Sequence, residues 1–277
     1  MDVAVITSVR NDKIYLKKWV DYYGSNFGRQ NLFVFIDGYD QDVPDGCDGV
    51  TFLWLPRRPL ERVPAMRRRA LAISDLGRAL HRFMDCVIAT DVDEYLLADP
   101  ARHASLHAFI EAQPKGLTTL SGLGLDVAQH LKIEDSIDLS KPFLGQRRFA
   151  HLSARYTKPV LSFRPVTWGS GMHRVKGRNF HIHPDLFHMH CGMIDYGLST
   201  GKTADKDRLA TGWGGHLQRR EKVFEIVTNG IARPGDDAFA AARTRQTWVR
   251  PFYAWNKPGM LPGDPVVEIP VRFFGLI

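Results

Sequence analysis

Short apolar runs of strand length alternate with helical patterns in the N-terminal third of the chain, and this alternation limits the folds open to it. The apolar runs lie at residues 3–9, 32–36, 50–55 and 84–90. Between them, apolar residues recur every three or four positions at 15–27 and again at 66–80, as on one face of a helix. Strands that are apolar throughout are typical of a parallel sheet covered on both faces. The pattern therefore predicts an α/β fold with a mostly parallel central sheet flanked by helices.

An acidic motif follows the fourth apolar run without a break. Residues 91–94 read Asp-Val-Asp-Glu and stand between the apolar residues 86–90 and 95–97. On an extended chain Asp91 and Asp93 point to the same side. Two carboxylates held together repel each other unless a cation joins them, so the motif predicts a site for Mg²⁺ or Mn²⁺ with a phosphate. The alternative is a simple acidic turn, against which the apolar neighbours on both sides argue.

Charge and cysteine content narrow the classes of partner. The net charge of the 277 residues is +7, and much of the excess is arginine in short clusters at 57–58, 67–69, 147–148 and 219–220. Such an excess favours nucleotides, phosphorylated sugars or anionic lipid surfaces as partners. No apolar stretch is long enough to cross a membrane, and the first residues show no signal-peptide pattern. With three scattered cysteines, these features predict a cytoplasmic protein, with peripheral contact to the inner face of the membrane as a further option.

Polar residues gather at the ends of the first, second and fourth apolar runs. In a parallel sheet these ends share one edge, and ligands of open α/β sheets bind at that edge. The edge carries the following residues: Thr7, Arg10, Asn11, Asp12, Asp37, Asp91 and Asp93. Neither a G-x-G-x-x-G fingerprint nor a P-loop is present. A phosphate bound here must therefore be held by a metal ion and by basic side chains.

Three segments resemble the family 2-like glycosyltransferases of the GT-A fold, in the branch whose D-x-D motif is followed by Glu and an aromatic residue. They are Arg10-Asn11-Asp12 with residues 16–23, residues 34–37, and residues 90–96. The resemblance covers roughly the first 100 residues well and the remainder in patches. It departs after the second strand, where residues 37–40 read Asp-Gly-Tyr-Asp instead of the usual D-x-x-S-x-D-G-T.

The resemblance implies an activity and a set of partners. It implies a metal-dependent transferase of the hexosyltransferase type that moves a sugar from a UDP- or GDP-linked donor to a hydroxyl of a glycan or lipid-linked acceptor, in surface polysaccharide biosynthesis. The implied cofactor is Mn²⁺ or Mg²⁺, and nucleic acid is not an expected partner. Because the chain has no repeat and no low-complexity linker, we expect one GT-A-like domain over residues 1–277, with 1–97 binding the nucleotide sugar and a looser 98–277 binding the acceptor.

The resemblance also implies roles for the polar edge. The residues that would contact the nucleoside are Thr7, Arg10, Asn11, Asp12 and Asp37. Asp91 would face the ribose or the metal and its water, Asp93 would bind the cation directly, and Glu94 would fix the loop. Arg67 is the candidate to offset the charge of the diphosphate, since a cation and an arginine stabilise such a leaving group without a proton. The alternative is that residues 67–69 form a solvated helix face.

Two H-x-H pairs stand out in the second half of the chain. They are His181 with His183 and His188 with His190, and each pair shares one face of a strand. Such pairs suit zinc, although their spacing fits no zinc finger. The resemblance offers another use, in which a late histidine returns to the cation of the D-x-D motif, and His190 is our candidate for that ligand. The alternative is a satisfied core histidine.

Further candidates belong to the acceptor side. An inverting transferase needs a carboxylate that takes the proton of the acceptor hydroxyl. Asp195 is our candidate for this base, and Asp126, on the glycine-rich stretch at 121–126, is its competitor and a candidate for acceptor binding. Trp168 is a candidate sugar-stacking face or else a buried core tryptophan. His173 lies beside it in the loop at 169–173 and is assigned to the acceptor side as well.

Two other functions stay open from the sequence. One is a metal-dependent hydrolase centred on the H-x-H pairs. The other is a non-catalytic polyanion-binding module, whose affinity would fall steeply with salt. The aromatic residues interleaved with basic ones at 243–257 suit a membrane surface or a polyanionic glycan, or they pack over the flank of the sheet.

Overall fold

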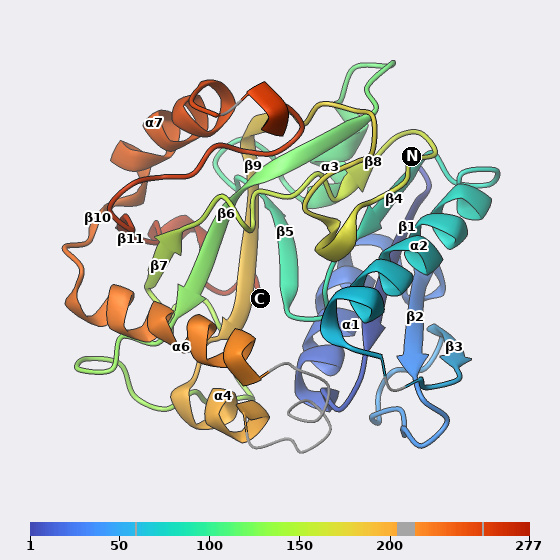
Figure 1. Cartoon of the computed structure of the whole chain (residues 1–277), viewed down its shortest axis with the longest axis horizontal. Coiled ribbons are helices and arrows are strands. Elements are labelled where there is room, and N and C mark those ends of the chain that lie inside the picture. Colours follow the sequence, from blue (N-terminus) through green and yellow to red (C-terminus); the bar gives the residue numbers. More distant parts are fainter. Residues whose placement is uncertain (59, 204–213, 251) are drawn as a thin grey trace.

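The first half of the chain builds a parallel sheet covered by a helix on each face. The computed structural model describes residues 1–58, 60–203, 214–250 and 252–277. Four parallel strands lie in the order β3-β2-β1-β4, namely β3 (Thr51–Leu55), β2 (Leu32–Asp37), β1 (Val3–Val9) and β4 (Cys86–Ala89). The helices α1 (Lys13–Phe27) and α2 (Arg62–Leu80) lie on opposite faces of these strands (Figure 1). The α/β fold predicted from the apolar runs is confirmed.

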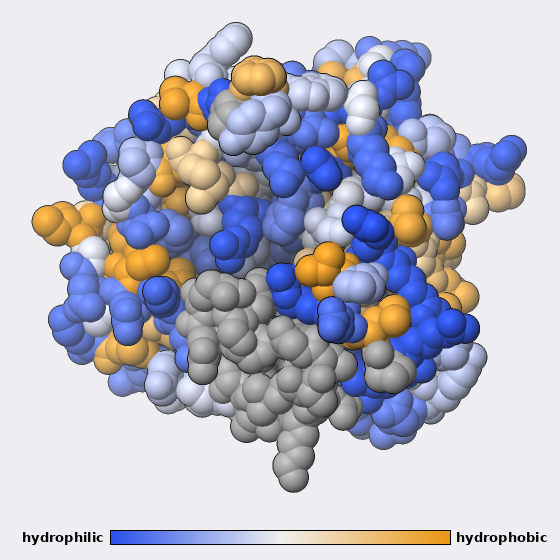
Figure 2. Space-filling model, viewed as in Figure 1, coloured by the Kyte–Doolittle hydropathy of each residue, from blue (hydrophilic) through white to orange (hydrophobic). Residues whose placement is uncertain are grey.

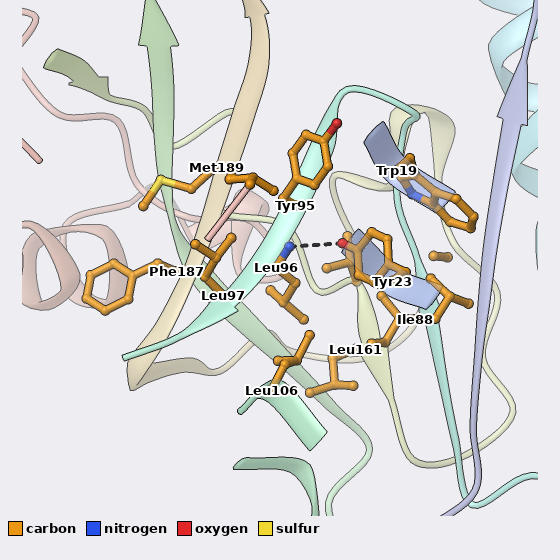
Figure 3. Packing of buried hydrophobic residues seen from close by; sticks show 14 of the residues in the cluster. Trp19, Tyr23, Ile88, Tyr95, Leu96, Leu97, Leu106, Leu161, Phe187 and Met189 are labelled. Carbon is orange, nitrogen blue, oxygen red and sulfur yellow. Dashed lines mark hydrogen bonds between the residues drawn. The ribbon is translucent and has the colours of Figure 1, made fainter. Parts of the chain in front are cut away.

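Helix α1 anchors the chain on both sides of the acidic motif. The indole N–H of Trp19 donates to the hydroxyl of Thr90, just before the motif, at 2.9 Å. The hydroxyl of Tyr23 accepts the backbone N–H of Leu96, just after it, also at 2.9 Å (Figure 3). All of these residues are buried. Because buried hydrogen bonds are costly to leave unmade, they hold the motif in place relative to the helix.

The acidic motif forms a tight turn. Strand β4 ends at Ala89, β5 (Glu94–Ala98) begins at Glu94, and the backbone N–H of Glu94 donates to the carbonyl of Asp91 at 3.0 Å. After the turn the chain leaves the parallel strands, and β5 pairs with a strand of the second half. The expectation that Asp91 and Asp93 alternate along an extended strand end is therefore wrong, because the chain has already turned at this point.

The second half adds long strands that pair with segments far away in the sequence. Two of these strands, β6 (Thr119–Ala128) and β9 (Ile182–Met193), run parallel to each other, and β9 pairs antiparallel with β5. The short β8 (Leu161–Ser162) lies antiparallel between β4 and β6 and joins the two halves into one sheet. Beyond β6 the sheet continues through β7 (Phe149–Leu152), β11 (Val266–Glu268) and β10 (Arg233–Pro234).

The described helices of the second half lie against different parts of this sheet. α3 (Leu106–Glu111) packs against β5 and α1. The other three pack against β9, namely α4 (Tyr196–Thr203), α6 (Gly214–Asn229) and α7 (Gly235–Trp248). The main hydrophobic core contains residues of both halves, from Trp19 and Tyr23 to Phe187 and Met189 (Figure 3). The face of the molecule seen in Figure 2 is mainly hydrophilic, with hydrophobic residues in small separate groups.

Two observations bear on the expected compartment. None of the helices in the described ranges is both long and apolar enough to cross a bilayer. Cys47, Cys86 and Cys191 are buried free thiols.

Candidate functional site

A pocket of about 340 Å³ lies at the edge where the parallel strands end. Its walls from the first half are residues 8–12 at the end of β1 and just after it, the end of β2, residues 55–58 and 60, the first turns of α2 and the 91–94 turn. The second half adds residues 155, 156 and 158 and the end of β9. The basic lining residues are Arg10, Arg57, Arg58, Arg68, Arg69, Arg155 and Lys158, and the acidic ones are Asp12, Asp37, Asp91, Asp93 and Glu94. Because basic groups outnumber acidic ones, the pocket favours an anion.

Asp91 is held by two basic side chains from distant parts of the chain. The Nη2 of Arg69 lies 2.7 Å from its Oδ1, and the Nζ of Lys158 lies 3.0 Å from its Oδ2. Lys158 also lies 2.5 Å from Oε1 of Glu94, and the side chains of both residues are at most 2% exposed. The other carboxylate oxygen of Glu94 accepts the backbone N–H of Asp91, which fixes the turn. Both carboxylate oxygens of Asp91 therefore face a cation that the chain itself supplies.

Burial and these cations act in opposite directions on the pKa of each acid. Burial raises the pKa of Asp91, but Arg69 and Lys158 outweigh it, so that this pKa lies well below its usual range. For Glu94 burial outweighs Lys158 and raises the pKa to about 7. Burial lowers the pKa of Lys158, whereas Asp91 and Glu94 raise it by more, so the ammonium stays charged at neutral pH.

Asp93 faces His190, whose other ring nitrogen contacts Asp126. The Nε2 of His190 lies 3.3 Å from Oδ2 of Asp93, and its Nδ1 lies 2.5 Å from Oδ1 of Asp126. The imidazole stacks on the ring of Tyr156 with centroids 3.9 Å apart. Strand register brings these groups together, because His190 on β9 pairs with Glu94 on β5 and with Asp126 on β6. The structure thus places His190 at the acidic motif, while its role as a metal ligand stays a prediction.

Most of the residues assigned to the nucleoside line the pocket. They are Arg10, Asn11, Asp12 and Asp37. The guanidinium of Arg10 donates to the carbonyl of Asp37 at 2.7 Å and pairs through both terminal nitrogens with Asp40. Thr7 does not line the pocket, whose lining begins at Ser8 and Val9, nearer the end of the strand. The Thr7 side chain is fully buried, and its hydroxyl has no hydrogen-bond partner among the described residues.

Helix α2 presents a different arginine from the one expected. Arg67 is exposed and is absent from the pocket lining, whereas Arg68 and Arg69 line the pocket and Arg69 binds Asp91. Successive helical residues point about 100° apart, so only part of the run at 67–69 can face the ligand. The arginine predicted to meet the diphosphate is therefore better placed at Arg69.

Asp195 lies outside the pocket lining, which corrects its candidacy as the base. Its carboxylate accepts the backbone N–H of Ile137 at 3.0 Å and that of Leu198, in the first turn of α4, at 2.9 Å. It also lies 3.6 Å from the guanidinium of Arg147, whose side chain is 1% exposed. These contacts make Asp195 a structural carboxylate. Its competitor Asp126 is also outside the lining and contacts the lining residue His190.

The two aromatic candidates of the acceptor side lie in different environments. Trp168 is buried, and its indole N–H donates to the carbonyl of Pro159 at 2.8 Å, so it is a core tryptophan and not a sugar-stacking face. His173 does line the pocket, and its Nδ1 donates to the carbonyl of Arg155 at 3.0 Å. Burial and the charge of Lys158 lower the pKa of His173 to about 3, so it offers a neutral imidazole to a ligand.

The metal ions expected from the sequence find little support in this geometry. Of the trio Asp91, Asp93 and His190, the first has both oxygens engaged by basic side chains. In the H-x-H pairs, His183 packs on the ring of Phe109, and the buried His188 donates to a backbone carbonyl. Across the described residues, no three His, Cys, Asp or Glu side chains are grouped to hold a metal ion. The predicted trio therefore does not fit a shared divalent cation as the side chains stand.

Sequence reasoning missed Lys158, which pairs with Asp91 and Glu94 at the floor of the pocket. The only signal for it is local: a single lysine stands directly before the apolar residues 159–161, where a charge must find a partner. Nothing in the sequence says that this partner is the acidic motif, because the contact joins residues 67 positions apart.

Comparisons with known proteins give no sequence relative and a distant structural one. No protein-family model matches the chain, and no curated protein matches it. Among solved structures it is similar to the mannose-1-phosphate geranyltransferase of Thermus thermophilus, at 12% identity over 97% of this chain and 74% of that chain, with a TM-score of 0.32. We therefore infer the function from the geometry of the pocket.

Proposed function

We propose that the protein is a glycosyltransferase of the GT-A type, which transfers a sugar from a nucleoside diphosphate sugar to an acceptor hydroxyl. The observation that carries this proposal is the basic pocket at the carboxyl edge of the parallel strands, where the acidic turn and the segment at 10–12 meet. This edge is the usual ligand site of open α/β sheets. Its volume of about 340 Å³ lies within the usual range for small-molecule sites.

The nucleoside and the diphosphate of such a donor match different walls of the pocket. The nucleoside lies against Arg10, Asn11 and Asp37, which surround the ends of β1 and β2. The diphosphate lies toward α2, where Arg68 and Arg69 present guanidinium groups that bind phosphate oxygens in pairs. In the reaction these arginines stabilise the charge that develops on the leaving diphosphate.

The proton of the acceptor needs a carboxylate that reaches the pocket. Among the acids of the turn, Asp91 and Glu94 are tied to Lys158, whereas Asp93 faces His190. We assign the role of proton acceptor in an inverting reaction to Asp93, with His190 and Asp126 holding its orientation. This assignment replaces Asp195, which lies outside the pocket lining.

The nature of the acceptor stays a prediction. A glycan or a lipid-linked sugar suits the proposal, and so does work at the inner face of a membrane. Exposed aromatic side chains near the C-terminal end of α7, namely Trp248, Phe252 and Tyr253, are the surface feature that suits contact with lipid.

Binding of nucleoside diphosphates tests the proposal. UDP or GDP at a hundred times its Kd should stabilise the folded chain by about 2.7 kcal/mol and raise Tm by about 5 °C or more. Asp37→Asn should weaken that binding, and Asp75→Asn, an exposed acid on α2, is the control. Absence of any shift with both nucleotides would contradict the proposal.

Transfer activity tests the role of Asp93. Release of the diphosphate from a donor sugar should fall about 100-fold or more in Asp93→Asn, with little change in Tm.

A further inference from the structure

Each acid of the turn at 91–94 already faces a basic side chain or an imidazole of the chain. Asp91 faces Arg69 and Lys158, Glu94 faces Lys158, and Asp93 faces His190. Resting on the proposed function, we propose that the pocket binds the diphosphate of its donor without a divalent cation, with the ammonium of Lys158 serving as the fixed positive charge between Asp91 and Glu94.

Backbone hydrogen bonds fix the position of Lys158 beside the turn. Its backbone N–H donates to the carbonyl of Tyr156 at 3.0 Å, and its own carbonyl accepts the N–H of Val160 at 2.9 Å. The carbonyl of Val160 in turn accepts the N–H of Ala89, the last residue of β4 before the acidic motif, at 2.9 Å. The lysine is therefore held beside the turn by backbone hydrogen bonds, and its side chain is only 2% exposed.

A divalent cation at Asp91 would have to displace this arrangement. Mg²⁺ needs an oxygen ligand at roughly 2.1 Å and tolerates little distortion of its octahedral shell. The oxygens of Asp91 already lie 2.7 Å from one cationic nitrogen and 3.0 Å from another. A metal ion placed there would repel both, and the buried lysine, driven off its two acids, would itself be left in the core without a partner. Asp93 with His190 is the remaining pair of donors, so a metal ion at this pair is the competing outcome.

The charge of a diphosphate can be met by the pocket itself. Arg68 and Arg69 on α2 and Arg57 and Arg58 before it all line the cavity. An arginine carries five N–H donors in a planar fork that matches phosphate oxygens, so an ion pair with Asp91 does not exhaust Arg69. Lys158 pairs with Asp91 and Glu94, so Arg69 can meet a phosphate while it stays bound to Asp91.

Calorimetric titration of the unmodified chain with UDP and GDP tests the inference directly. We expect the Kd for the nucleotide that binds to change by less than about threefold between EDTA and saturating Mn²⁺ or Mg²⁺. Binding that appears only with the metal ion overturns the inference and leaves the proposed function standing. Binding of neither nucleotide under either condition overturns the proposed function and the inference together.

Substitution of the lysine gives a second, independent measurement. In Lys158→Met we expect affinity in EDTA to fall about tenfold or more, because Asp91 loses its ammonium partner and then repels the phosphates. Mn²⁺ should recover part of this loss, since the unpaired acids can now take the cation. Lys141→Met, at an exposed lysine paired with Asp138, is the matched control and should bind like the parent. Unchanged affinity of Lys158→Met in EDTA overturns the inference.

Folding of these variants must be separated from binding. Removal of Lys158 leaves a buried acid without its partner, so the double change Lys158→Met with Glu94→Gln keeps fewer unpaired charges in the core. We expect the double variant to unfold at a higher temperature than Lys158→Met and still to bind more weakly than the parent in EDTA. If neither variant folds, the comparison of EDTA with Mn²⁺ on the unmodified chain decides the matter alone.

Discussion

The two sides of the pocket are built in different ways. The side from the first half consists of side chains at strand ends and on α2, such as Arg10, Asp37 and Arg69, which keep part of their surface in contact with solvent. The side from the second half has a buried floor of Lys158 and His190, which are paired with acids, beside His173 and the exposed Arg155. The first side is therefore available to a ligand, whereas the buried pairs of the second set the charge and shape of the floor. Substitutions on the first side should change the affinity for the ligand. Substitutions of residues that support the second side from outside the pocket should change the free energy of unfolding.

The largest effect on stability is expected at Asp195, which supports the second side from outside the pocket. Asp195→Ala removes the acceptor of two backbone N–H groups and an acid that faces the buried Arg147. We expect the free energy of unfolding to fall by about 3 kcal/mol, measured by urea denaturation. Diphosphate affinity should stay within about twofold of the parent. Asp138→Ala, at an exposed acid, is the control. A variant with full stability and no transfer activity would instead restore Asp195 as the base.

A smaller effect, which depends on pH, is expected at His188. Burial and the charge of Lys158 lower the pKa of this imidazole to about 3 in the folded chain, against about 6.5 when unfolded. Between these values the unfolded chain binds more protons, so this contribution is present above pH 6.5 and is lost as the pH falls toward 3. The loss amounts to at most about 1.4 kcal/mol per pH unit, or about 2 kcal/mol between pH 6.5 and 5.

The variant His188→Asn isolates that contribution. Asparagine can still donate to the carbonyl of Tyr156, which accepts from the Nδ1 of His188 at 2.7 Å, but it does not titrate. Urea unfolding at pH 7, 6 and 5 should show a flatter pH dependence in the variant than in the parent. Equal slopes would mean that the imidazole of His188 titrates alike in the folded and unfolded chains, and that burial and Lys158 do not keep it neutral.

The fold of the first half was predictable because its signals are local. Each apolar run at 3–9, 32–36, 50–55 and 84–90 became a strand close to those bounds, and the helical patterns between them became α1 and α2. In the second half β6 pairs with β9 across some sixty residues, and β8, which joins the halves, is only two residues long. Such pairing depends on tertiary contacts, which periodicity in one segment does not encode.

Site residues that stand at strand ends could be predicted from the sequence, whereas those placed by tertiary packing could not. The acidic turn, Arg10, Asp37 and His190 meet in one region, as the motifs indicated. Lys158 and the engaged state of Asp91 were missed, because a buried ion pair between distant segments leaves no pattern in either. Trp168 was misplaced on the acceptor side, since residue type alone does not reveal burial.

Two neighbouring arginines of α2 provide the finest test of the first side. Arg69 lines the pocket and binds Asp91, whereas Arg67, two residues earlier on the same helix, is exposed and outside the lining. Both changes to alanine remove one positive charge and have the same helical propensity. We expect Arg69→Ala to weaken UDP or GDP binding about tenfold, or ~1.4 kcal/mol, and Arg67→Ala to weaken it less than twofold, by calorimetric titration at 0.15 M salt. Equal losses in the two variants would mean that the net charge of the helix attracts the ligand, and that the geometry of the first side contributes little.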